Sequence, residues 1–278
     1  GDGIDRIEDQ TFRQCHNLAS VTIGDGATEI GYEAFSDCEA LASVVFGTNV
    51  AAIGDMAFAM CRNLVALTIP DGVRNIGGGA FNSCDGLVSV AMGSGVTNIG
   101  SSAFAGCTNL LNAPIGAGVV SIGASAFSSC TSMTNAVIPG SATSIGNEAF
   151  AGCNVLANVY CLGDAPAIDG AYLFSGNEIA IVYYLPGTMG WGETFGGRPA
   201  VLWVPKIAEE GLGMEVGRFG FQMDWAPGRS VVVEACASMA DPDWIPVATN
   251  LLADGTGTFE DAGEPSAVGR FYRVVPAP

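Results

Sequence analysis

The sequence predicts an α/β solenoid of 23-residue coils, followed by a small all-β, sandwich-like domain. Three observations support this fold class: a repeat that keeps its spacing over seven copies, a mixture of helical and strand periodicity within each copy, and a different pattern after the repeats. A fixed period of 20 to 50 residues is the signature of a solenoid. Because a solenoid mainly offers a long surface, this architecture favours binding over catalysis.

The repeat follows the frame I-x-x-x-[AT]-F-x-x-C-x-x-[LM]. Its isoleucines are Ile7, Ile30, Ile53, Ile76, Ile99, Ile122 and Ile145. Its phenylalanines are Phe12, Phe35, Phe58, Phe81, Phe104, Phe127 and Phe150, and its cysteines are Cys15, Cys38, Cys61, Cys84, Cys107, Cys130 and Cys153. We expect all three columns to point into the core of the solenoid.

Within one repeat, the apolar residues come first at helical and then at strand spacing. Ala57, Phe58, Cys61 and Leu64 are three or four positions apart, as on one face of a short helix. Leu67 and Ile69 then alternate with other residues, as in a strand. The segment 70–72, Pro-Asp-Gly, turns the chain before a second extended stretch. Each coil is therefore expected to hold a helical turn and two short strands.

These repeats resemble the BspA-like leucine-rich repeats of bacterial surface proteins, with their frame I-G-x-x-A-F-x-x-C-x-x-L, a strand and a Pro-x-x-Val turn. The resemblance covers residues 1 to about 160. The following stretch is similar to the family's terminal coils, where aromatic residues such as Tyr183, Trp191 and Trp203 would close the core. We therefore expect a solenoid over residues 1–204 with capping coils at 162–204. The resemblance implies an exported protein that adheres to or binds host proteins.

Residues 205–278 show a second pattern. Strand-like segments at 219–223, 230–235, 245–249 and 270–275 are separated by turn clusters at 226–228 and 254–257. This predicts a small antiparallel β-sandwich. The pattern is similar to a C-terminal module of exported bacterial proteins.

Composition excludes several classes of partner. The formal net charge is -18 with only 10 basic residues, so nucleic acid and anionic membrane surfaces would be repelled. No run approaches the roughly 18 apolar residues of a membrane span, and no signal peptide is visible. Residues 2–7 align with residues 71–76, in the middle of a repeat. Since natural solenoids usually cap their first coil, we expect sequence upstream of Gly1.

The nine cysteines are best explained as packing residues. Metal sites use close pairs such as C-x-x-C, and no such pair occurs here. Stacking would bring the frame cysteines of neighbouring coils within disulfide distance, but seven cysteines in one row cannot all form pairs. We expect buried thiols, with disulfides or a metal as alternatives. Cys236 has no obvious partner in the second module.

Signatures of enzymes are nearly absent, and we expect no enzyme activity, no cofactor and no metal. His16 is the only histidine and is expected to be an ordinary exposed residue. A catalytic triad or an H-E-x-x-H zinc site would have to use it. A glycosidase needs only two carboxylates, so a carboxylate-based hydrolase stays an alternative. Calcium is a further alternative in the second module, where the oxygen donors are Asp241, Asp243, Asp254, Glu260, Asp261 and Glu264.

Charge is distributed unevenly along the chain. No Asp, Glu, Lys or Arg occurs from Gly86 through Asn147. The outward positions of the strands there are expected to be small and uncharged, and we take them as the candidate interaction surface: Ser89, Ala91, Asn112, Pro114, Asn135, Val137, Asn158 and Tyr160. Alternatively, the small residues serve only to allow regular stacking.

These observations lead to three functional hypotheses. The first is a non-enzymatic, secreted or cell-surface bacterial protein that binds an extracellular protein or glycan through the solenoid. The second is a structural subunit that associates with copies of itself in an extracellular array or filament. The third is the carboxylate-based hydrolase.

Overall fold

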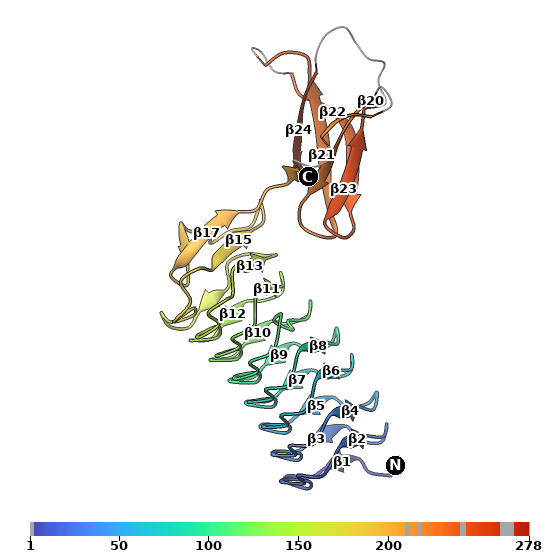
Figure 1. Ribbon diagram of the computed structural model, residues 1–278, viewed down its shortest axis with the longest axis vertical. Helices are drawn as coiled ribbons and strands as arrows, with labels where there is room; N and C mark the ends of the chain where they lie inside the picture. The colour runs from blue at the N-terminus through green and yellow to red at the C-terminus, as the bar shows by residue number, and fades with distance from the viewer. Residues whose placement is uncertain (1–2, 209–211, 216–217, 240–242, 262–269, 278) are drawn as a thin grey trace. The chain divides into compact units, whose positions relative to one another are not determined.

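The computed structural model describes residues 3–208, 212–215, 218–239, 243–261 and 270–277. The chain forms two compact units, Gly1–Val201 and Leu202–Pro278. The first unit is a β-solenoid, with coils stacked in chain order (Figure 1). The predicted leucine-rich solenoid is confirmed, but the α/β class is wrong, because the described residues contain no helix.

A parallel sheet of eight two-residue strands runs along one side of the solenoid, with one strand from each coil. The strands are β1 (Arg6–Ile7), β3 (Glu29–Ile30), β5 (Ala52–Ile53), β7 (Asn75–Ile76), β9 (Asn98–Ile99), β10 (Ser121–Ile122), β12 (Ser144–Ile145) and β14 (Ala167–Ile168). Each isoleucine of the repeat frame pairs with the one in the next coil, as Ile30 does with Ile53. The fixed period thus becomes a fixed register.

A second row of strands follows the cysteine of each coil and is interrupted. It contains the pairs β2 (Ser20–Thr22) with β4 (Ser43–Val45) and β6 (Ala66–Thr68) with β8 (Ser89–Ala91). It resumes as β11 (Asn135–Ile138), β13 (Asn158–Cys161) and β15 (Ile181–Tyr184), joined to β17 (Arg198–Leu202) and β16 (Thr194–Phe195). We number the coils from the one that begins at Ile7, so that coil five begins at Ile99. Between these parts, coil five contributes one bridge, from Asn112 to Asn135.

The segment predicted as a helical turn is a pair of tight turns. Alternate N–H groups donate hydrogen bonds to carbonyl groups of the next coil. Phe35 donates to the Ala57 carbonyl at 2.7 Å and Asp37 to the Ala59 carbonyl at 2.8 Å. The N–H groups between them bond within their own coil, as the Ser36 N–H does to the Glu33 carbonyl at 3.1 Å. An α-helix would bond every N–H to the carbonyl four residues earlier. Here half of them bond to the next coil, so the turns themselves extend the stacking.

Left-handed residues produce this geometry. In each coil of the repeat, positive φ recurs at two positions four residues apart, for example Met56 (φ 53°) with Met60 (φ 60°) and Ser125 (φ 55°) with Ser129 (φ 61°). Each such residue reverses the handedness of the backbone and ends one turn. The spacing of Ala57, Phe58, Cys61 and Leu64 is therefore the same as in a helix, although the backbone is not helical.

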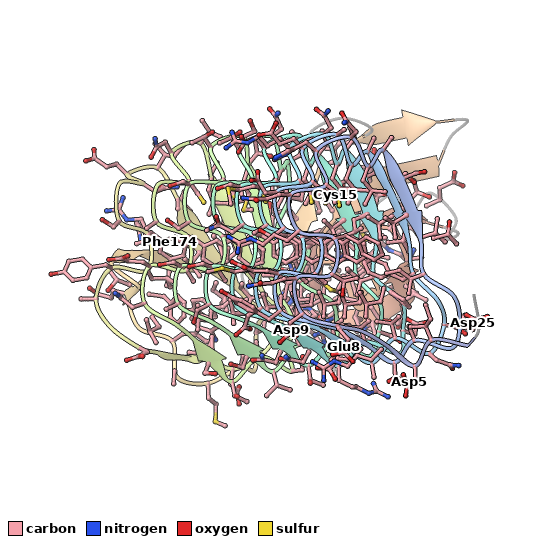
Figure 2. The ribbon with its side chains drawn as sticks, turned by 90° about the horizontal axis from the view of Figure 1, so that it is seen from below. Asp5, Glu8, Asp9, Cys15, Asp25 and Phe174 are labelled. Atoms are coloured by element: carbon pink, nitrogen blue, oxygen red, sulfur yellow. The ribbon has the colours of Figure 1, made fainter. Side chains whose placement is uncertain are left out.

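The core is a continuous column of phenylalanine rings flanked by aliphatic side chains. Rings of neighbouring coils stack from Phe12 to Phe174 with centroids 5.0–5.7 Å apart. Side chains fill the interior of the coils, whereas Asp5 and Asp25 point outward from the first one (Figure 2). The frame phenylalanines from Phe35 to Phe150 are fully buried, and Phe12 in the first coil is 39% exposed.

Six cysteines form a second column beside the rings. Each Sγ donates to the carbonyl of the phenylalanine one coil earlier at 3.1–3.3 Å, from Cys38 to Phe12 through Cys153 to Phe127. Eight of the nine cysteines are buried. The expectation of burial is wrong only for Cys15, which is exposed in coil one.

Aromatic residues close the far end of the first unit, as expected for Trp191. The Trp191 ring stacks on Tyr184 at 5.1 Å and touches Phe195 at 5.1 Å. The Trp191 indole N–H donates to the Thr188 hydroxyl at 3.0 Å. Tyr183 does not take part in this closure, since Val182 next to it points into the core.

The second unit contains two antiparallel sheets. One consists of β18 (Lys206–Ile207), β20 (Arg218–Asp224), β19 (Gly213–Glu215) and β23 (Thr256–Glu260); the other of β22 (Ile245–Leu252), β21 (Arg229–Cys236) and β24 (Phe271–Pro276). Rings from both sheets meet where Phe221 and Phe259 approach Tyr272. The assignment to a β-sandwich module of exported proteins stays a prediction.

Candidate interaction surface

Alternation in β11, β13 and β15 divides inward from outward residues. Ala136, Val159 and Val182 are buried, and the residues on either side of them face outward. The parallel register aligns these outward residues in two rows. The rows are Asn135–Asn158–Ile181 and Val137–Tyr160–Tyr183, and we call these six residues the β11–β15 face.

Sequence reasoning named four of these six residues and missed Ile181 and Tyr183. Both lie 23 positions after their predicted neighbours, Asn158 and Tyr160. The period therefore continues through the second row of strands after the I-x-x-x-A-F frame has been lost. This continued 23-residue spacing is the sequence signal that identifies Ile181 and Tyr183 as outward residues.

The remaining candidate residues lie in coils four and five, where the second row of strands is interrupted. Ser89, Ala91 and Asn112 are exposed. Pro114 is buried, so its predicted outward position is wrong. Proline lacks the N–H that a central strand must donate. The coil turns inward there, with the Ile115 N–H bonded to the Ala113 carbonyl at 2.9 Å.

Amide side chains link neighbouring coils across the β11–β15 face. The Asn158 side chain donates from Nδ2 to Asn135 Oδ1 at 3.0 Å, and Asn135 in turn donates to the Thr134 hydroxyl. A similar amide pair occurs on the other side of the solenoid, from Asn98 to Asn75 at 2.6 Å. These contacts fix the outward amides in one orientation.

The two tyrosines form a stacked pair on the same face. The rings of Tyr160 and Tyr183 are 5.4 Å apart with an interplanar angle of 20°. Partial burial, with a smaller contribution from Tyr183, raises the pKa of Tyr160. The phenol therefore adds no charge to this face at physiological pH. With exposed Val137 beside them, the tyrosines form an uncharged aromatic platform.

Charged contacts in the first unit lie in the early coils. Arg6 pairs with Glu29 at 3.5 Å, Arg13 with Glu33 at 3.1 Å and Arg62 with Asp85 at 3.2 Å. Asp25 and Asp71 instead accept the backbone N–H of Thr48 and Ser94 in the next coils, which lowers the pKa of both carboxyls. The stretch from Gly86 to Asn147 contains no charged residue, so the candidate surface is uncharged across coils five and six.

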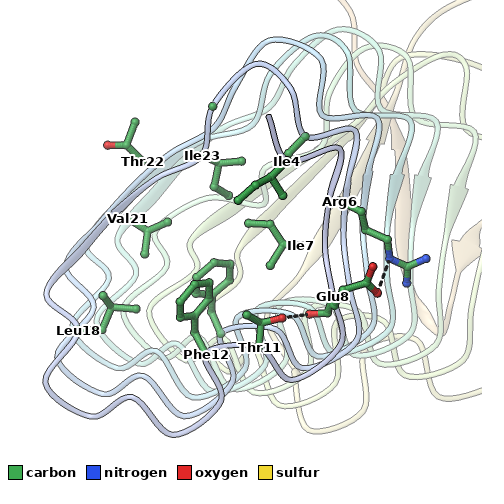
Figure 3. Close-up of a pocket in the computed structure, with 13 residues that line it drawn as sticks. Ile4, Arg6, Ile7, Glu8, Thr11, Phe12, Leu18, Val21, Thr22 and Ile23 are labelled. Atoms are coloured by element: carbon green, nitrogen blue, oxygen red, sulfur yellow. Dashed lines mark hydrogen bonds and ion pairs between the residues drawn. The ribbon is translucent and has the colours of Figure 1, made fainter. Parts of the chain in front are cut away.

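The open end of coil one contains an apolar cavity of about 390 Å³. Its lining includes Ile4, Ile7, Phe12, Leu18, Val21 and Ile23, and the Arg6–Glu8 ion pair lies at its edge (Figure 3). In later coils the residues equivalent to Phe12 and Leu18 are covered by the coil before them. This cavity is thus the end of the core, formed by the same side chains that pack elsewhere.

The calcium alternative in the second unit finds little support among the described donors. Asp254 accepts hydrogen bonds from both the backbone and the hydroxyl of Thr256 at 3.1 and 3.0 Å. Asp261 pairs with Arg270 at 3.0 Å and accepts from the Tyr272 hydroxyl. Asp241 and Glu264 lie outside the described residues.

In the part of the chain that the structure describes, no helix is long and apolar enough to cross a membrane.

A stack of 23-residue coils with an inward Ile–Phe–Cys–Leu frame defines a repeat protein of the leucine-rich class. The BspA type leucine-rich repeat region matches residues 1–111 and 52–180 with six copies. The chain belongs to this family. Repeats of this class generally mediate contacts between proteins.

Several solved structures of bacterial leucine-rich repeat proteins are similar to this chain. A cell surface protein of Faecalibacterium prausnitzii is 25% identical, with a TM-score of 0.41, covering 64% of each chain. A protein of T. pallidum is 23% identical with a TM-score of 0.38, covering 55% of this chain and 72% of that one. A Bacteroides ovatus protein is 23% identical, with a TM-score of 0.39, covering 64% and 58%. No curated protein is significantly similar.

The coverage of these relatives is partial. The similar region spans less than two thirds of the F. prausnitzii and B. ovatus chains.

Proposed function

We propose that this chain is a non-enzymatic binding protein of the bacterial cell surface, which recognises an extracellular protein through the β11–β15 face. The observation that carries the proposal is the uncharged surface formed by the Tyr160–Tyr183 stack and the Asn135–Asn158 amide pair. Interface cores are depleted in charge and enriched in tyrosine. Membership of the BspA type repeat family supports a surface role.

The rigidity of this face also supports binding. Its strands are joined in parallel register from β11 through β15, and their inward side chains are buried in the core. A preformed surface loses little conformational entropy when a partner binds. The exposed residues Ser89, Ala91 and Asn112 extend the uncharged area towards the earlier coils.

Substitutions that add charge without changing shape provide the test. Asn112→Asp with Asn135→Asp introduces two carboxylates, and the carboxylate at position 135 can still accept the hydrogen bond from Asn158. Ala19→Asp with Ala42→Asp is the matched control, because both alanines are exposed on early coils. Binding to a panel of extracellular-matrix proteins is measured by surface plasmon resonance. We expect the first pair to weaken binding at least tenfold and the control to retain it.

Two outcomes would contradict this proposal. Equal binding by both double variants would move the contact away from the β11–β15 face. Binding to a glycan panel but to no protein would leave the surface in place and change the class of partner. Removal of the platform by Tyr160→Ala with Tyr183→Ala should reproduce the loss without a change of charge.

Self-association is a second candidate function, favoured by one observation. A chain with net charge -18 repels its own copies, and the stretch from Gly86 to Asn147 is where this repulsion is weakest. Two copies would then pack against each other through this uncharged stretch in an extracellular assembly. The molar mass in solution distinguishes self-association from partner binding.

A further inference from the structure

The only histidine of the chain lies beside two carboxylates at the start of the solenoid. His16 in coil one, with Asp37 and Glu39 in coil two, each offer one ligand atom, and the three atoms are within 4.8 Å of one another. His16 and Glu39 are exposed and Asp37 is half-buried. A dissolved ion can therefore reach all three side chains.

The solenoid itself brings the three residues together. His16 and Glu39 occupy the same position of the repeat, one coil apart, so stacking places one above the other. Asp37 stands two residues before Glu39 at a left-handed turn position (φ 61°). The backbone is held by hydrogen bonds from His16 N–H to the Gln14 carbonyl at 2.8 Å and from Asp37 N–H to the Ala59 carbonyl at 2.8 Å.

The nearby arginines pair with other carboxylates, so this group keeps negative charge that a bound cation can balance. Arg13 and Arg62 are the basic residues closest in sequence to the two carboxylates, yet they pair with Glu33 and Asp85. The other repeats do not reproduce the group, since Arg62, Asp85 and Thr108 follow His16 and Glu39 in the column. The combination of one imidazole and two carboxylates is thus particular to coils one and two.

We propose that His16, Asp37 and Glu39 form a binding site for a zinc ion. Zinc takes imidazole nitrogen and carboxylate oxygen ligands at about 2.0–2.2 Å, usually with tetrahedral geometry. Two ligands of such an ion are then about 3.4 Å apart, which small side-chain rotations reach from the present spacing. Three protein ligands leave the fourth position to water. Calcium and magnesium prefer oxygen ligands alone, whereas an imidazole nitrogen is a typical zinc ligand.

The site is separate from the β11–β15 face and does not depend on the proposed function. An ion held by both coils would link coil one to coil two. Since a ligand that binds only the folded state stabilises it, zinc should also raise the melting temperature of the first unit.

The single histidine makes the direct test simple. The imidazole gives one set of ¹H–¹³C signals, which is followed while zinc chloride is added to the whole chain at constant pH. We expect a saturable shift that is complete at one equivalent. Isothermal titration calorimetry should show at least a tenfold weaker affinity for His16→Ala, Asp37→Asn and Glu39→Gln, each with an unchanged melting temperature in the absence of zinc.

Two control variants separate this site from other zinc ligands. Cys15→Ser removes the exposed thiol next to His16, and Glu178→Gln removes an exposed carboxylate far from coils one and two. Both should bind zinc as the unchanged chain does. The proposal is overturned if the imidazole signals do not move, if His16→Ala binds with full affinity, or if only Cys15→Ser loses the ion.

Discussion

At the scale of single residues, position in the stack determines how much each phenylalanine contributes. Phe104 is fully buried, with the rings of Phe81 and Phe127 at 5.3 and 5.5 Å on its two sides. Phe12 stacks on Phe35 alone among the column rings and is 39% exposed. Replacing the inner Phe104 therefore removes more ring contacts than replacing Phe12, although both occupy the same repeat position.

Replacement of Phe104 by alanine should lower the free energy of unfolding by about 3–5 kcal/mol, because it removes a large core side chain and leaves a cavity. Phe12→Ala should cost clearly less. Equilibrium urea unfolding of the two variants measures the difference. Equal losses would show that the ring column does not stabilise the inner coils more than the first.

Cysteine reactivity should divide the thiols into two classes. Cys15 is exposed, and the other eight cysteines are buried. Under native conditions one thiol should react quickly with Ellman's reagent, and the others only after unfolding. Cys15→Ser should abolish the fast phase. Several fast thiols, or ladder disulfides found by mass mapping, would refute the buried-thiol interpretation.

The buried thiols should also make stability depend on alkaline pH. Burial raises the pKa of Cys61, Cys107 and Cys161 from 9.0 to about 12. A raised pKa in the folded state means that the unfolded chain loses its protons first as pH rises. This stability is fully present below pH 9 and is lost between about pH 9 and pH 12. The free energy of unfolding should fall less steeply in that range for Cys107→Ala than for the unchanged chain, and parallel curves would contradict this.

At the scale of elements, periodicity predicted the inward residues but not the backbone that carries them. Ala57, Phe58, Cys61 and Leu64 are all buried, as their spacing indicated. Side chains three and four apart share one face both in a helix and in two successive tight turns. The difference lies in the left-handed residues Met56 and Met60, and neither methionine is typical of that conformation. Sequence alone therefore could not distinguish the two.

The left-handed positions provide a prediction about the turns. Ser125 has φ 55°, whereas Ser128 in the same coil is not among the positive-φ residues. Ser125→Gly should stabilise the first unit by up to about 1 kcal/mol, because glycine has no steric cost at positive φ. Ser128→Gly is the matched control and should destabilise it by about 0.5–1 kcal/mol. Thermal unfolding of both variants decides this, and the same sign for both would contradict the turn geometry.

At the scale of the whole molecule, the repeat predicted the solenoid, its register and most of the β11–β15 face. The break at Pro114 could have been expected from its missing N–H, but the extension to Ile181 and Tyr183 required following the strands after the frame ended. The meeting of His16 with Asp37 and Glu39 depends on rotamers as well as repeat position. Spacing places these residues in adjacent coils but does not direct their side chains to one point.

Net charge finally determines how self-association should respond to salt. With 28 acidic and 10 basic residues, two copies repel each other over a Debye length of about 30 Å at 0.01 M salt and about 8 Å at 0.15 M. If the uncharged stretch from Gly86 to Asn147 is a contact between copies, the molar mass from light scattering should rise above 28.3 kDa as salt increases. Asn112→Asp with Asn135→Asp should stay monomeric, and Ala19→Asp with Ala42→Asp should associate like the unchanged chain. A mass of one chain at every salt concentration would exclude the assembly and leave recognition of a different protein as the use of this face.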